Sequence, residues 1–122
     1  MKISGAESLI MEALWRKNPL TAEDVAATVG AEQNWSDTTV KTLLGRLLKK
    51  NAVAAEKDGR RYVYSPLVAR SDYVADESRS LIDRLFDGKL APLVSHFAEN
   101  NELTQADIAE LKRLIQELDD ER

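Results

Sequence analysis

The chain has 122 residues, no cysteine and one histidine, His96, and its formal net charge at pH 7 is −4. A chain of this length buries only a modest core as one domain or two very small ones, so association with a second subunit would add stability. The missing cysteines exclude disulfides and thiolate metal sites, and a single histidine leaves few arrangements for zinc or nucleophilic catalysis. We therefore expect no enzyme, no cofactor and no metal site.

Membrane and secretion signals are also missing from the sequence. No apolar run is long enough to span a bilayer, and no basic-then-apolar leader follows Met1. These two features predict a cytoplasmic protein.

The charge is distributed unevenly along the chain. Residues 1–66 carry 10 basic and 8 acidic side chains, a net charge of +2, whereas residues 67–122 carry 7 basic and 13 acidic ones, a net charge of −6. The stretch 41–61 alone has a balance of +5, because two acids accompany the cations Lys41, Arg46, Lys49, Lys50, Lys57, Arg60 and Arg61. Since Lys and Arg supply most of the non-specific affinity for phosphates, this local basic face is compatible with DNA binding.

Two helices are predicted at the N-terminus. Ser4 and Glu7 have the spacing of a capping box, and the helix that follows should end near Asn18, because a proline comes next. Thr21 is placed to cap a second helix, and Gly30 is predicted to end it.

A third predicted helix is strongly two-faced. It begins after a cap at Ser36 or Asp37 and closes near Lys50, with Asn51 in the left-handed cap position. At 100° per residue one face is apolar, formed by Val40, Leu43, Leu44, Leu47 and Leu48, and the opposite face holds Thr38, Thr42, Gly45, Arg46 and Lys49. One face therefore packs against the protein and the other is free to meet a partner.

A hairpin is predicted to follow the third helix. The strand-like runs 53–56 and 62–64 flank a segment that contains Asp58-Gly59, a common hairpin turn pair. Three helices and a hairpin make a winged helix-turn-helix. Pro66 ends the last strand, so we place a winged-helix domain at residues 1–66 and a helical dimerisation domain at 67–122, a fold that is mostly α with a small β hairpin.

The candidate DNA-binding residues follow from this arrangement. A recognition helix needs short polar side chains near its start and long cations further along, and a wing needs cations at its tip. These requirements select Ser36, Thr38, Thr39, Lys41, Thr42, Arg46 and Lys49 on the helix and Arg60 and Arg61 on the hairpin. Two alternatives stay open: the helix face is only a solvated surface, and the hairpin cations only keep an edge strand soluble.

Gly45 and the two tryptophans say less about function than the charged residues do. Glycine costs about 1 kcal/mol relative to alanine in a helix interior, so Gly45 reflects either a close approach of DNA or plain tolerance. Trp15 and Trp35 are expected to pack in the core or at a hinge, since no run of exposed aromatics accompanies them.

The acidic half is predicted to be helical and dimeric. Its apolar stripes have too little chain around them to be covered internally, and residues 108–118 follow coiled-coil spacing. The candidate dimerisation residues are Leu81, Leu85, Phe86, Leu93, Phe97, Ile108, Leu111, Ile115 and Leu118. The alternative is a self-contained helical cap on the winged helix.

Several motifs together resemble the penicillinase-repressor family, the BlaI, MecI and CopY group. They are ISGAE at 3–7, Trp15, Trp35-Ser36, TVKTLLGRLLKKN at 39–51, GRRYVYSP at 59–66, Ser71-Asp72-Tyr73, LVSHF at 93–97 and LTQADIAEL at 103–111. The resemblance implies a bacterial repressor that binds an inverted-repeat operator as a homodimer. It further implies control of β-lactamase or other stress-response genes until a signal, in some members from a membrane sensor protease, inactivates the repressor.

The chain departs from the family pattern in three places. Members often have Pro-Lys after the serine of the recognition helix, whereas Asp37-Thr38 follows Ser36 here, so the operator or the affinity for it is expected to differ. The Asn-Phe cleavage bond of the β-lactam-responsive members aligns with His96-Phe97, which is therefore a candidate cleavage bond whose first residue has changed. The cysteine cluster of the copper-responsive branch is missing, which excludes copper sensing by thiolates.

Two further function classes compete with repression. In the first, the winged helix is a protein-interaction module and the acidic half binds a partner. In the second, the chain is a hydrolase, which has little support because the sequence shows no paired carboxylates and no serine-histidine or metal-ligand spacing.

Overall fold

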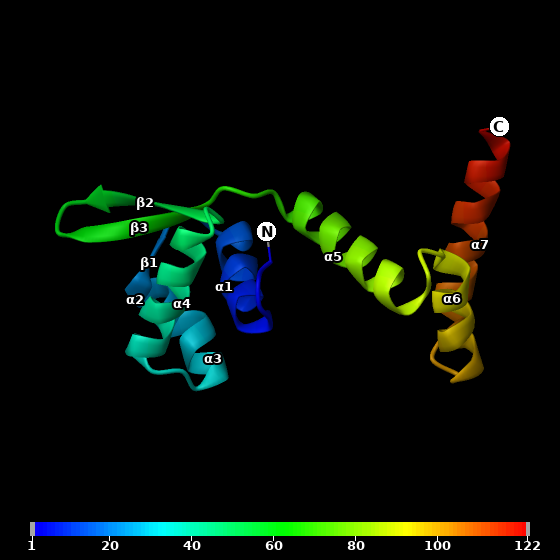
Figure 1. Cartoon of the computed structure of the whole chain (residues 1–122), viewed down its shortest axis with the longest axis horizontal. Coiled ribbons are helices and arrows are strands. Elements are labelled where there is room, and N and C mark those ends of the chain that lie inside the picture. The colour runs from blue at the N-terminus through cyan, green and yellow to red at the C-terminus, as the bar shows by residue number, and fades with distance from the viewer. Residues whose placement is uncertain (1, 122) are drawn as a thin grey trace. The chain divides into compact units, whose positions relative to one another are not determined.

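The computed structural model describes residues 2–121 and divides into two compact units, one up to Ala75 and one from Asp76 on. The elements of the first unit are α1 (Gly5–Arg16), β1 (Leu20–Thr21), α2 (Ala22–Val25), η1 (Ala26–Gly30), α3 (Ala31–Gln33), α4 (Asp37–Lys49), β2 (Val53–Asp58) and β3 (Arg61–Pro66). The helix α5 (Arg70–Leu85) begins in the first unit and ends in the second, which also holds α6 (Leu90–Glu99) and α7 (Gln105–Asp120) (Figure 1). The outer ends of the two predicted domains, Met1 and Arg122, lie outside the described residues.

The start of α1 has the predicted capping box. Ser4 Oγ accepts a hydrogen bond from the Glu7 amide at 3.1 Å, and Glu7 Oε1 accepts one from the Ser4 amide at 2.8 Å. The helix ends at Arg16, near the predicted position, and buries Ile10, Met11 and Leu14.

The second helix is longer than predicted. Gly30 has right-handed helical angles, and the helical segment continues through a π-helical turn, η1, and through α3 to Asn34, which takes the left-handed conformation at φ 59°. The prediction that Gly30 ends this helix is therefore wrong. A Cβ at Gly30 would lie only 3.2 Å from Val40 Cγ2, so this glycine permits close packing against α4 and does not terminate the helix.

The third predicted helix, α4, is confirmed together with both of its ends. Ser36 is the N-cap residue, and Asn51 has φ 59° after the last turn. The predicted apolar face is directed inward: Leu48 is half-buried, and the buried residues are Val40, Leu43, Leu44 and Leu47. This face joins α1 and the second helix in one apolar cluster, against which Trp15 and Trp35 pack as partly buried side chains.

The predicted hairpin forms and gains a short third strand. β2 and β3 pair antiparallel with Asp58 opposite Arg61, so Gly59 and Arg60 are the two loop residues, and Gly59 has the positive φ, +66°, that such a loop requires. β1 pairs with β3, which gives the strand order β1-β3-β2 over the described residues. In Figure 1 the β2–β3 hairpin extends beyond the helices of its unit.

The segment after β3 packs back onto α1. Trp15 Nε1 donates a hydrogen bond to the carbonyl of Val68 at 2.9 Å, and the Trp15 ring centroid lies 5.5 Å from that of Tyr73. Arg70 Nε lies 3.0 Å from Glu12 Oε1. These contacts attach residues 68–73 to the first unit, so the structural division falls inside α5.

The second unit leaves much of its apolar surface uncovered. Thr104 and Asp107 form a capping box at the start of α7. Among the described residues of this unit, the one buried apolar side chain is Ile82. A hollow of about 390 Å³ between α6 and α7 is lined by Leu93, Val94, Phe97, Glu102, Leu103, Asp107, Glu110 and Leu111. No helix within residues 2–121 is long and apolar enough to cross a membrane.

Candidate nucleic-acid interface

The outward face of α4 carries most of the predicted site residues. Thr38, Lys41, Thr42, Arg46 and Lys49 are all exposed, whereas the apolar side of the same helix is buried. The structure therefore presents short hydroxyl side chains in the first half of the helix and long cations along it, as a helix that enters a groove of DNA requires.

Two predicted residues also have a role inside the protein. Ser36 Oγ accepts a hydrogen bond from the Thr39 amide at 3.1 Å and lies 3.0 Å from Thr39 Oγ1, and Thr39 is half-buried. These contacts cap α4 and hold its first turn in place. Ser36 and Thr39 thus position the exposed face next to them.

The hairpin supplies a second group of exposed cations. Arg60 lies in the loop, Lys57 and Arg61 lie on the strands beside it, and all three side chains are exposed. Arg61 Nη2 lies 3.9 Å from Asp58 Oδ2, but both groups are largely in water, where such a pair adds little stability. The guanidinium of Arg61 remains available to a partner.

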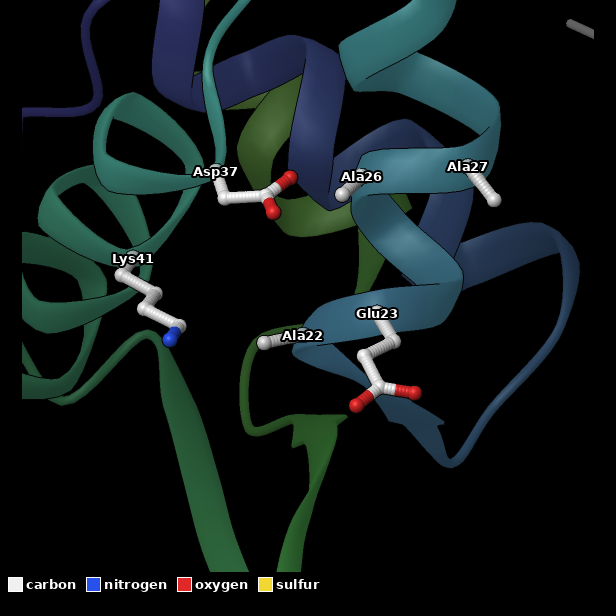
Figure 2. A pocket seen from close by; sticks show the side chains of 6 residues that line it. All are labelled: Ala22, Glu23, Ala26, Ala27, Asp37 and Lys41. Carbon is white, nitrogen blue, oxygen red and sulfur yellow. The ribbon is translucent and has the colours of Figure 1, made fainter.

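Two hollows border α4, and the hairpin lines one of them. One, of about 410 Å³, lies between the start of α4 and the second helix and is lined by Ala22, Glu23, Ala26, Ala27, Asp37 and Lys41 (Figure 2). The other, of about 270 Å³, is lined by Thr21, Ala22, Glu23, Lys41, Arg61, Tyr62 and Tyr64. Lys41 borders both, so a cation of the helix and one of the hairpin reach the same surface.

Sequence reasoning missed Glu23 and Tyr62 at this surface. Each comes from an element other than α4, and Tyr62 is 52% exposed on β3 without any motif that marks it. Only the packing of β3 beside the second helix brings Tyr62 to the hollow that Lys41 and Arg61 line.

Acidic groups also face this surface. Figure 2 shows the Asp37 carboxylate and the Lys41 ammonium group directed toward the hollow, with Glu23 at its border. The neighbouring Asp24 has a pKa below its ordinary value, because the backbone and side chain of Thr21 hydrogen-bond its carboxylate and Arg61 adds a favourable charge. Acidic side chains therefore lie among the cations of this face.

Lys50 belongs to the basic stretch but not to the exposed face. Its Nζ lies 2.5 Å from Glu7 Oε1, and the Glu7 side chain is 1% exposed whereas that of Lys50 is 34% exposed. Burial raises the pKa of Glu7, but hydrogen bonds from Lys50 and Ser4 outweigh it and hold the pKa below its ordinary value. Glu7 therefore neutralises Lys50, and the exposed face has one cation fewer than the sequence count suggests.

Known proteins are similar to this chain in sequence and in fold. The family described as "Penicillinase repressor" matches residues 3–117. The penicillinase repressor of Bacillus licheniformis is 34% identical over 116 residues, which cover 95% of this chain and 91% of that protein. The methicillin resistance regulatory protein MecI of Mammaliicoccus sciuri is 32% identical over 114 residues, with 93% of each chain covered.

A solved structure has a similar fold over part of this chain. The monomeric form of Bacillus licheniformis BlaI, solved in complex with the blaP half-operator, has 36% sequence identity and a TM-score of 0.53, and the match covers 60% of this chain and 89% of that one. The predicted fold class, mostly helical with a small sheet and a winged helix, is confirmed. Because the family matches residues 3–117 and these relatives are similar over nearly the whole chain, the chain belongs to the penicillinase repressor family.

Proposed function

We propose that this protein is a transcriptional repressor that binds an inverted-repeat DNA operator as a homodimer. The observation that carries the proposal is the continuous exposed surface on which the polar face of α4 meets the hairpin through Lys41 and Arg61. The BlaI structure supports it, since that relative was solved with a half-operator. DNA binding would place the protein beside the chromosome, in the bacterial cytoplasm.

Each element has a distinct task in this proposal. The helix α4 enters the major groove, where Thr38 and Thr42 are short enough to approach base edges and Arg46 is long enough to reach guanine or a phosphate. Arg60 and Arg61 follow the backbone as a wing and set the register without reading bases.

The second unit supplies the proposed dimer contact. The predicted seam on α7 divides into two parts: Ile108 and Leu111 are half-buried, whereas Ile115 and Leu118 are 58% and 62% exposed. Leu81, Leu85 and Phe97 are exposed as well. A second copy would cover this apolar surface and place two α4 helices on paired half-sites.

The proposal also covers the target gene and the step that releases the repressor from DNA. A penicillinase repressor among the relatives favours β-lactamase or another stress-response gene as the target. Proteolysis at His96-Phe97, directed by a membrane sensor protease, is the proposed release. That bond lies inside α6, and Phe97 borders the hollow between α6 and α7, so cleavage requires local opening of the helix.

Selection against random duplexes tests the proposal directly. At near-physiological salt the protein is expected to enrich one inverted repeat, with an affinity roughly a thousandfold or more above non-specific binding. A well-folded dimer that enriches no sequence would overturn the proposal.

A charge-reversal pair separates DNA binding from the protein-interaction alternative. K41E/R46E removes two exposed cations of α4 and should abolish binding to the selected duplex, whereas K89E/K112E makes the same charge change in the second unit and should retain it. Repression in cells that survives K41E/R46E would favour an interaction module.

A further inference from the structure

Gly45 stands at the centre of the exposed face of α4. Thr42 and Lys49 are exposed three residues before and four residues after it, so the three positions form one row along the helix. Glycine is the least favourable residue for a helix interior apart from proline. An exposed, mid-helix position would ordinarily hold alanine or a longer side chain.

Nothing inside the described part of the chain explains this glycine. A Cβ added at Gly45 would meet no heavy atom of other parts of the protein within 4 Å. By contrast, Gly30 allows the close approach of Val40, and Gly59 provides the positive φ of the hairpin loop. The packing of the described residues therefore does not require a glycine at position 45.

We propose that Gly45 is a specificity-determining position, where base edges of the operator approach the α4 backbone more closely than any side chain would permit. The inference rests on the proposed function, because it requires that this face of α4 meets DNA. Arg46 and Lys49 are exposed, long cations close to Gly45. They can extend to the duplex while the backbone of α4 at Gly45 sits deep in the groove. A methyl group at position 45 would then collide with these base edges and weaken this contact locally.

The test compares G45A with the matched variant G5A. Gly5 is also exposed, has open space where a methyl group would stand, and lies at the start of α1, outside the set of residues proposed to contact DNA. Both variants should keep or raise the midpoint of thermal unfolding, since alanine is the better helix former. G45A should bind the selected duplex about tenfold more weakly, as expected for overpacking of a close contact, and G5A should bind it like the unmodified protein.

Two further measurements make the result specific. G45V, with a larger side chain, should weaken binding to the selected duplex more than G45A does. The dependence of log K on log salt should stay the same for G45A, because no phosphate contact is lost, and binding to random duplexes should change less than binding to the selected one.

The outcomes separate this inference from the proposed function. If the unmodified protein selects a duplex and G45A binds it equally well, the inference is wrong and the repressor proposal stands. Equal losses on selected and random duplexes would also overturn it, because base edges would not be the groups involved. If the unmodified protein selects no duplex, the proposed function fails first, and the inference fails with it.

Discussion

The ion pair of Glu7 and Lys50 joins the first turn of α1 to the residue that follows α4. Glu7 is almost completely buried and Lys50 is partly in water, with 2.5 Å between Glu7 Oε1 and Lys50 Nζ. Glu7 also closes the capping box of α1. One side chain thus links the N-terminal cap to the end of the proposed recognition helix.

Removing the cation should destabilise the fold. K50M leaves a buried carboxylate without its partner, and we expect the free energy of unfolding at pH 7 to fall by about 1–2 kcal/mol, discounted because Lys50 is partly exposed. Urea unfolding measures the change. The control is K49M at an exposed neighbour, which should change stability by less than about 0.5 kcal/mol.

The difference in free energy of unfolding between the unmodified protein and K50M should depend on pH. The pKa of Glu7 is lower in the folded than in the unfolded state, so the pair stabilises the protein above the ordinary carboxyl pKa and loses this effect as the pH falls through the folded value. The difference between the unmodified protein and K50M should therefore shrink toward acidic pH. A constant difference from pH 7 to pH 3 would contradict this assignment.

Asp37 is the other residue with a testable charge effect. Its carboxylate is directed toward the hollow that Lys41 lines, on the surface proposed to meet phosphates. D37N should raise the affinity for the selected duplex about three- to tenfold, although loss of a first-turn anion lowers the stability of α4 by about 0.3–1 kcal/mol. E99Q on α6 is the control and should leave the affinity unchanged; an unchanged affinity in D37N as well would place Asp37 away from the DNA.

At the scale of elements, the hairpin was the easier prediction and the second helix the harder one. An Asp-Gly pair between two strand-like runs identified the turn, because a two-residue loop needs a residue that tolerates positive φ. The same reasoning failed at Gly30, since a glycine that ends a helix and one that admits a neighbouring side chain look alike in a sequence. β1 was missed because two residues are too few to show alternation.

The wing and the recognition helix should differ in how they respond to salt. R60A/R61A removes two proposed phosphate contacts, so binding should weaken about equally on selected and random duplexes, and the slope of log K against log salt should fall in magnitude by about 1.8. Fluorescence titrations at several salt concentrations measure this slope.

T42A provides the contrasting variant on α4. It removes a hydroxyl proposed to approach base edges, so the selected duplex should lose affinity while the salt slope stays constant. If R60A/R61A changed the sequence preference and left the salt slope unchanged, the hairpin would be the part that reads bases, which would contradict the proposed roles of the hairpin and α4.

At the scale of the whole molecule, assembly depends on apolar side chains that one chain leaves in water. Leu114, Ile115 and Leu118 on α7 and Leu85 on α5 are all exposed. The three on α7 lie within five residues on one side of that helix, and exposed apolar side chains gathered in this way commonly mark an interface between subunits.

Charged side chains introduced at this surface should abolish dimerisation and leave the binding of a single DNA half-site intact. I115D/L118D is expected to be monomeric by analytical ultracentrifugation, to keep its binding to a half-site and to lose at least about tenfold in affinity for the inverted repeat. Q116D, at an exposed polar position between them, is the control and should remain dimeric. A variant I115D/L118D that stays dimeric would place the interface elsewhere.

The sequence by itself determined the order of the longer helices and the hairpin, the caps of α1 and α4 and the inward and outward faces of α4, because helical periodicity, capping and turn residues act over a few neighbouring positions. It also determined the family, through motifs that resemble those of the penicillinase repressors. Only the tertiary structure showed that Lys50 pairs with Glu7, that Gly30 accommodates Val40, and that Tyr62 and Arg61 border the hollow of Lys41. These features are contacts between residues far apart in the chain. They depend on how the helices and the sheet pack, which no local pattern specifies.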